Sequence, residues 1–198
     1  MHYCMQESHD QIHMLKWARE SPLFSDYINK TSGTGLVGHS MGGGATVGSA
    51  SNASAIGTHD IKVAVAMHPA IGMCSTQPCH PKIPIAFLTG DADTTVKPAT
   101  VKAQYDETSG VEKVFVENKG NTHIDATGWS FQPVGCGHCP VGSGAGEQNC
   151  CSGPNNEDVY AHDWLDCKIK ADVAACSRVA ACREPGNTAT KCEHALKS

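Results

Sequence analysis

The sequence predicts an α/β fold with a mostly parallel β-sheet. Short apolar segments alternate with segments of helical spacing, an order typical of parallel sheets flanked by helices. Two of the apolar segments, "IKVAVAMHP" and "IPIAFLTG", are hydrophobic almost throughout, as expected where helices cover both faces of a sheet. A chain of 198 residues, 40% hydrophobic and 18% charged, is long enough to build one such domain around a proper core.

The expected elements run in the order helix, strand, helix, strand, strand, helix, strand, helix. The first helix is expected at 9–20, because Ser8 and Gln11 form a capping-box pattern and Pro22 follows the last helical position. Pro98 suits the first turn of a later helix. The strands are expected at 35–40, 61–69, 83–90 and 111–120, and the remaining helices at 41–52, 97–110 and 156–170.

Composition excludes several classes of protein. The formal net charge is −5 and the Lys and Arg residues form no cluster, so nucleic acid is not an expected partner. No run of about 18 apolar residues occurs, so no membrane span is expected. The pair His9 and His13 lacks the intervening glutamate of H-E-x-x-H. We therefore expect no metal and no other cofactor, and the oligomeric state stays open.

The stretch "TGLVGHSMGGG", residues 34–44, contains a candidate nucleophile. Its G-H-S-M-G core matches G-x-S-x-G, in which a serine stands on a strained turn between a strand and a helix. Flanking glycines avoid clashes that a side chain would create in such a turn, and the helix N-terminus favours developing negative charge. The motif predicts that Ser40 is exposed for attack; a Gly/Ser-rich turn with a hydrogen-bonded serine is the structural alternative.

A serine nucleophile needs a base to take its proton and an acid to orient that base. After the expected strand 83–90, the segment "DADTTVKP" offers Asp91 and Asp93. After the expected strand 111–120, "NTHIDATG" offers His123. Reactive groups of α/β proteins gather at the carboxyl ends of parallel strands, and all three candidates follow such ends. The order serine, aspartate, histidine therefore predicts a catalytic triad.

These motifs resemble the α/β-hydrolases of the dienelactone hydrolase and cutinase-like polyester hydrolase group. The resemblance rests on Gly38-His39-Ser40-Met41-Gly42-Gly43, on Gly90-Asp91-Ala92-Asp93-Thr94 with the later Pro98, and on Thr122-His123. It extends over about residues 10 to 170 and is specific for the superfamily rather than for a substrate.

The resemblance implies a role for each matching residue. It favours Asp93 over Asp91 as the acid, because the family's aspartate precedes a small polar residue shortly before a proline. Asp91 is then a solvated or capping carboxylate. It also implies that the Met41 backbone N–H contributes to an oxyanion hole. Candidate residues of the substrate pocket are His39, His68, Ala70 and Val96, with a purely structural role as the alternative for the two histidines.

Eleven cysteines indicate an oxidising compartment, and two N-x-[ST] sequons agree weakly with secretion. Eight cysteines lie between Cys136 and Cys192, and disulfides are favoured over a zinc site because C-x2-C occurs once. Cys74 and Cys79 bracket a short loop and are expected to pair, which leaves Cys4 over. We divide the chain into a catalytic domain at 1–170, with a Cys/Gly-rich insertion at about 128–156, and a Cys-containing tail at 171–198.

The resemblance also implies strands before the nucleophile strand that the first 33 residues do not supply. Together with the unmatched Cys4 and the absence of a signal peptide, this leads to the hypothesis that the chain is the C-terminal portion of a longer secreted hydrolase. Three functions are open. The first is a serine hydrolase that acts on small-molecule or polymeric carboxylic esters. The second is a weak or inactive hydrolase fragment that serves as a disulfide-rich binding module. The third is thiol or metal binding by the tail.

Overall fold

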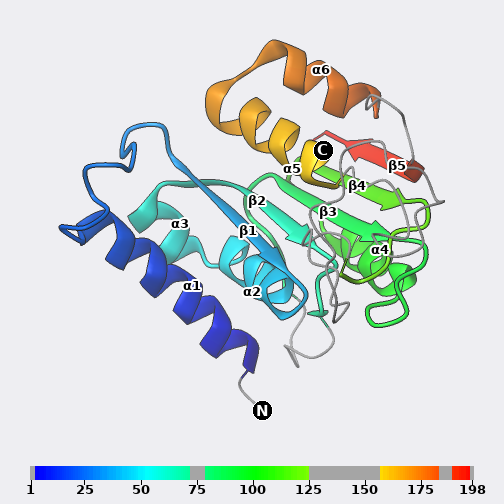
Figure 1. Ribbon diagram of the computed structural model, residues 1–198, viewed down its shortest axis with the longest axis horizontal. Helices are drawn as coiled ribbons and strands as arrows, with labels where there is room; N and C mark the ends of the chain where they lie inside the picture. The colour runs from blue at the N-terminus through cyan, green and yellow to red at the C-terminus, as the bar shows by residue number, and fades with distance from the viewer. Residues whose placement is uncertain (1–2, 72–78, 125–156, 183–188, 197–198) are drawn as a thin grey trace, which may run out of the picture.

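The computed structural model describes residues 3–71, 79–124, 157–182 and 189–196, and it confirms an α/β architecture with a mostly parallel sheet. The five strands are arranged in chain order, β1-β2-β3-β4-β5 (Figure 1). Each of the first four is parallel to its neighbour, and β5 is antiparallel to β4. The strands are β1 Thr34–His39, β2 Ile61–Met67, β3 Ile85–Gly90, β4 Lys113–Asn118 and β5 Ala189–Ala195.

Helices cover both faces of the sheet, so the side chains of β2 point alternately into two separate cores (Figure 1). Ala64 and Ala66 face the core under α1 to α4, whereas Val63 and Val65 face the core under α5 and α6. Strand β3 is buried at every position. The helices are α1 Tyr3–Glu20, α2 Met41–Ala50, α3 Ala53–His59, α4 Pro98–Glu107, α5 Glu157–Leu165, the π-helical turn η3 Asp166–Lys170, and α6 Val173–Ala181.

The first helix begins earlier than the capping pattern predicts. Ser8 lies inside α1, and its hydroxyl donates to the Ala45 carbonyl oxygen at 3.1 Å instead of capping the helix. The Gln11 amide donates to the Thr46 hydroxyl at 2.9 Å. The predicted capping box is therefore wrong, because both side chains bind α2 across the helix interface rather than their own backbone.

The described residues of the predicted tail form a helix and a strand. Beyond η3 the chain forms α6, and β5 then adds an antiparallel strand to β4. Disulfides join Cys167 to Cys176 and Cys182 to Cys192, which confirms that cysteines of this segment form disulfides. The second bridge fastens β5 to the end of α6. Cys74 of the predicted Cys74–Cys79 pair lies outside the described residues, and so does the whole predicted insertion at 128–156.

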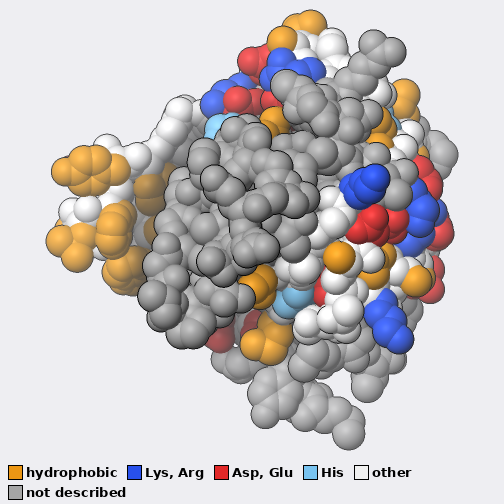
Figure 2. Space-filling view, turned by 45° about the vertical axis from the view of Figure 1, so that its right-hand side comes forward, with side chains coloured by type: hydrophobic (Ala, Val, Ile, Leu, Met, Phe, Trp, Pro, Cys, Tyr) orange, Lys and Arg blue, Asp and Glu red, His pale blue; other side chains and the backbone are white. Residues whose placement is uncertain are grey.

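In the described part of the chain, β1 pairs with β2 alone and forms one edge of the sheet. The segment between α1 and β1 carries exposed hydrophobic side chains at Leu23, Phe24 and Tyr27, and hydrophobic side chains gather at the left of Figure 2. Phe24 packs edge-to-face against Trp17 of α1. Among the described residues, no helix combines the length and the hydrophobicity that crossing a membrane requires.

Candidate active site

Ser40 stands between β1 and α2 in a backbone conformation that L-residues rarely adopt. Its φ is 56° and its ψ is −119°. Two backbone hydrogen bonds hold the turn, because the Ser40 N–H donates to the Met67 carbonyl oxygen at 3.0 Å and the Ala70 N–H donates to the Ser40 carbonyl oxygen at 2.9 Å. A strained serine fixed to the end of the neighbouring strand is the geometry that the G-x-S-x-G motif predicts.

The glycines around Ser40 differ in whether a side chain could be accommodated at their position. A Cβ on Gly38 would overlap the Gly42 carbonyl group, and one on Gly43 would lie 2.8 Å from the Met67 carbonyl oxygen. A Cβ on Gly42 would meet no atom within 4 Å. The turn therefore needs Gly38 for its own closure and Gly43 for the close approach of α2 to β2, whereas Gly42, the last glycine of the motif, has open space beside it.

Ser40, His123 and Asp93 form one chain of hydrogen bonds. His123 Nε2 lies 2.8 Å from Ser40 Oγ, and His123 Nδ1 lies 2.9 Å from Asp93 Oδ2. An ionised carboxylate only accepts hydrogen bonds, so the proton of the neutral His123 ring is on Nδ1. The lone pair of Nε2 then accepts a hydrogen bond from the Ser40 hydroxyl. The three residues come from the carboxyl ends of β1, β3 and β4, as the sequence predicts, and the His123 side chain is 14% exposed.

The geometry distinguishes the two aspartates of "DADTTVKP". Asp93 Oδ1 accepts from the backbone N–H groups of Thr95 and Val96, each at 2.8 Å, which leaves Oδ2 for His123. Asp91 Oδ1 instead accepts from the Gly120 N–H at 2.6 Å. Asp91 thus ties the loop after β3 to the loop after β4, and Asp93 contacts the histidine.

The Asp93 carboxylate is stabilised in its charged form although it is buried. Burial raises the pKa of Asp93, but the hydrogen bonds from His123, His68 and the backbone N–H groups of Val96 and Thr95 outweigh it and hold that pKa below its ordinary value. Asp93 is therefore an anion at neutral pH, as a residue that orients an imidazole must be.

A second histidine shares the same carboxylate oxygen. His68 Nδ1 lies 2.7 Å from Asp93 Oδ2, and His68 Nε2 lies 3.0 and 3.1 Å from the two carboxylate oxygens of Glu157. Asn121 Nδ2 donates to Glu157 Oε1 at 3.0 Å. His68, Glu157 and Asn121 are each completely buried. Sequence reasoning missed Glu157 and Asn121, because no motif marks them and Glu157 is 64 positions beyond Asp93 (157 − 93).

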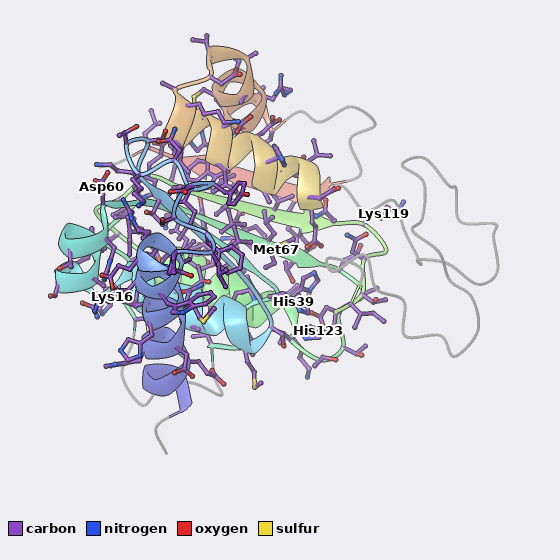
Figure 3. The ribbon with its side chains drawn as sticks, turned by 60° about the vertical axis from the view of Figure 1, so that its left-hand side comes forward. Lys16, His39, Asp60, Met67, Lys119 and His123 are labelled. Atoms are coloured by element: carbon purple, nitrogen blue, oxygen red, sulfur yellow. A yellow bond between two sulfur atoms is a disulfide. The ribbon has the colours of Figure 1, made fainter. Side chains whose placement is uncertain are left out.

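His39 supports the loop that carries His123. The His39 Nε2–H donates to the His123 carbonyl oxygen at 2.6 Å, and the two rings are 4.9 Å apart between centroids. Figure 3 shows the two labelled side chains close together beyond the ends of the strands. Burial is the main cause that lowers the pKa of His39, so at neutral pH the ring is uncharged with its proton on Nε2.

The other predicted pocket residues offer little surface to a ligand. His68 is completely buried, and Ala70 and Val96 are 4% and 8% exposed. Of the four predicted lining residues, His39 alone is partly rather than fully buried. Met41 is half exposed and begins α2, so its N–H is one of the helix-terminal donors that have no acceptor within the helix.

His68, Asp93 and His123 are residue types that can bind a metal ion, and one ligand atom of each lies within 4.8 Å of the others. However, the two histidine nitrogens lie 2.7 and 2.9 Å from the same Asp93 oxygen, which are hydrogen-bond distances. Protons therefore account for these contacts.

The chain matches no protein-family model and no curated protein sequence.

Proposed function

We propose that this protein is a serine hydrolase of the α/β-hydrolase type that cleaves carboxylic esters through an acyl-enzyme. The observation that carries the proposal is the hydrogen-bonded series Ser40–His123–Asp93, presented on a strained turn at the carboxyl edge of a parallel sheet. The resemblance of the surrounding motifs to dienelactone hydrolases and cutinase-like polyester hydrolases agrees with it.

In the proposed reaction, Ser40 Oγ attacks the ester carbonyl carbon while its proton passes to His123 Nε2. Asp93 stabilises the imidazolium that forms. The Met41 N–H, at the start of α2, donates to the carbonyl oxygen as it becomes an oxyanion. Collapse of the tetrahedral intermediate expels the alcohol, which takes the proton from His123. A water molecule then attacks the acyl-enzyme by the same route and releases the acid.

The substrate class is a small-molecule or polymeric ester. The disulfides of the C-terminal segment support an oxidising compartment, and we propose that the protein is secreted.

The test is covalent labelling of the full chain with a fluorophosphonate probe, alongside hydrolysis of p-nitrophenyl acetate. We expect stoichiometric labelling at Ser40, and Ser40→Ala should abolish both labelling and hydrolysis. Ser177→Ala is the matched control, because the Ser177 hydroxyl donates to a carbonyl oxygen within α6 and lies outside the proposed triad. A folded wild-type chain that neither reacts with the probe nor hydrolyses the ester would contradict the proposal.

A further inference from the structure

We propose that His68 and Glu157 form a buried ion pair behind the triad, in which the His68 imidazolium positions Asp93 and Glu157 balances its charge. The inference rests on the proposed function, because positioning Asp93 matters only if His123 acts as a base. The two residues touch neither Ser40 nor the reacting atoms, so they are positioning residues.

The geometry favours a charged His68. Both ring nitrogens face carboxylate oxygens, and carboxylates only accept, so both nitrogens must carry protons. The two oxygens of Glu157 lie at nearly equal distances from Nε2, 3.0 and 3.1 Å, which suits an N–H shared by an ionised carboxylate. Asn121 donates a further N–H to Glu157, and Glu157 is the first residue of α5, where the helix dipole favours negative charge.

Four titratable groups surround the His68 ring. Asp93 comes from the loop after β3 and Glu157 from α5, while the rings of His39 and His123 lie 5.7 and 5.5 Å away between centroids. Burial lowers the pKa of His68, but the hydrogen bond and charge of Glu157, followed by those of Asp93, outweigh it and raise that pKa above its ordinary value. The two carboxylates therefore decide the state of the ring.

Charge balance explains why Glu157 is needed. Asp93, His68 and Glu157 together carry two negative charges and one positive charge, so the set facing His123 keeps a net charge of −1. If Glu157 were neutral while His68 stayed protonated, that set would carry no net charge. The imidazolium that forms on His123 during the reaction would then be less stabilised.

Glu157→Gln tests this directly, because glutamine keeps the size of the side chain and an acceptor for His68 Nε2–H. The readout is the second-order rate constant of fluorophosphonate labelling at Ser40 between pH 5.5 and 9. We expect labelling to fall about tenfold at the acid end. The deficit should shrink as pH rises, because the loss of Glu157 lowers the pKa of His68 and deprotonation restores the net charge of −1.

A second substitution sharpens the test. His68→Asn in the Glu157→Gln background removes the uncompensated cation, and asparagine tolerates the positive φ of 43° at this position. The double variant should therefore label faster than Glu157→Gln at the acid end. Asp163→Asn is the matched control, since Asp163 is a buried carboxylate of the same helix that pairs with Arg178, and it should label like wild type at every pH.

The ionisation of His68 is read independently of activity by ¹⁵N NMR of histidine-labelled protein. We expect both ring nitrogens of His68 to be protonated near pH 7 in wild type and in Asp163→Asn, but not in Glu157→Gln. A neutral His68 in wild type would overturn the ion pair. A labelling deficit that is equal at all pH values, or absent, would overturn the positioning role. If wild-type Ser40 does not label, the proposed function fails while the NMR result still decides whether the ion pair exists.

Discussion

His123 and His68 both contact one carboxylate oxygen, and each does so through the same ring nitrogen. Each places Nδ1 within 3 Å of Asp93 Oδ2, at 2.9 and 2.7 Å. They differ in what faces Nε2, which is the Ser40 hydroxyl for His123 and the Glu157 carboxylate for His68. They also differ in burial, because the His68 side chain has no exposed surface and that of His123 is 14% exposed.

Under the two proposals above, the partner of the second nitrogen sets the chemistry of each histidine. A hydroxyl can give up a proton, so His123 is placed to act as a base. A carboxylate has no proton to give, so the same ring at His68 is held as a cation. Both histidines are hydrogen-bonded to one oxygen of Asp93, but His123 is suited to proton transfer and His68 to charge balance.

The largest expected difference between His123 and His68 is in the rate of Ser40 labelling. His123→Ala should lower the rate of fluorophosphonate labelling by about 10⁴-fold or more, because nothing remains to take the Ser40 proton. The double variant His68→Asn/Glu157→Gln should stay within about tenfold of wild type, because Asp93 keeps its charge. Equal losses in the two variants, with both folded by circular dichroism, would mean that the histidines do not have separate roles.

The free energy of unfolding should depend more on His68 than on His123. His68→Asn leaves Glu157 buried without its cation, which should lower the free energy of unfolding by about 3–5 kcal/mol, whereas adding Glu157→Gln should restore part of the loss. His123→Ala removes one partner of the buried Asp93 carboxylate, which keeps His68 and two backbone N–H donors, so it should cost less. Urea unfolding of the four proteins at pH 6 measures this. A double variant less stable than His68→Asn would contradict a charge-based cause.

The pH dependence of stability should also report His68. Because its pKa is raised in the folded protein, its contribution is fully present below its ordinary pKa of about 6.5 and is lost as pH rises through the raised value. The pKa of Asp93 is lowered, so its contribution is present above about 3.9 and is lost as pH falls through the lowered value. The advantage of wild type over His68→Asn should therefore be greatest between about pH 4 and 6.5, and urea unfolding across pH checks this.

A smaller effect is expected from His39, which holds the backbone of His123 but no charge. His39→Ala removes the N–H that binds the His123 carbonyl oxygen, and labelling should fall by several-fold, roughly the value of one neutral hydrogen bond. His39→Gln supplies an amide donor and should recover part of the rate. Because His39 is neutral at pH 7, the deficit should not change between pH 7 and 9; a deficit that does change would show that its charge matters.

The smallest effect is expected at Asp91. Asp91→Asn keeps an oxygen that accepts from the Gly120 N–H, so labelling should stay within about twofold of wild type. Asp93→Asn should instead lower labelling by about 10³-fold or more, because it no longer fixes the His123 tautomer. Comparable losses at the two positions would contradict the assignment of Asp93, rather than Asp91, to His123.

Much of the sheet was predictable from sequence because its signals are local. β1, β2, β3, β4 and α4 lie within a few residues of their expected bounds, since continuous apolar segments and Pro98 mark them without reference to distant parts of the chain. The helices α3 and α6 and the strand β5 were missed, and both α6 and β5 lie in the segment 171–198 that was predicted as a tail. α3 is short and has no apolar periodicity, and β5, "ATKCEHA", becomes a strand by pairing with β4 and by the Cys182–Cys192 bridge.

The sequence by itself therefore determined the α/β order, the turn at Ser40, and the positions of Asp93 and His123 at strand ends, because each depends on neighbours in the chain. The family resemblance favoured Asp93 over Asp91, and the tertiary structure brought Asp93 against His123. Only the tertiary structure placed His68 between two carboxylates that are 64 residues apart in sequence (157 − 93). Hydrogen bonds are short and directional, so the partner of a buried nitrogen is fixed only once helix α5 packs against the sheet.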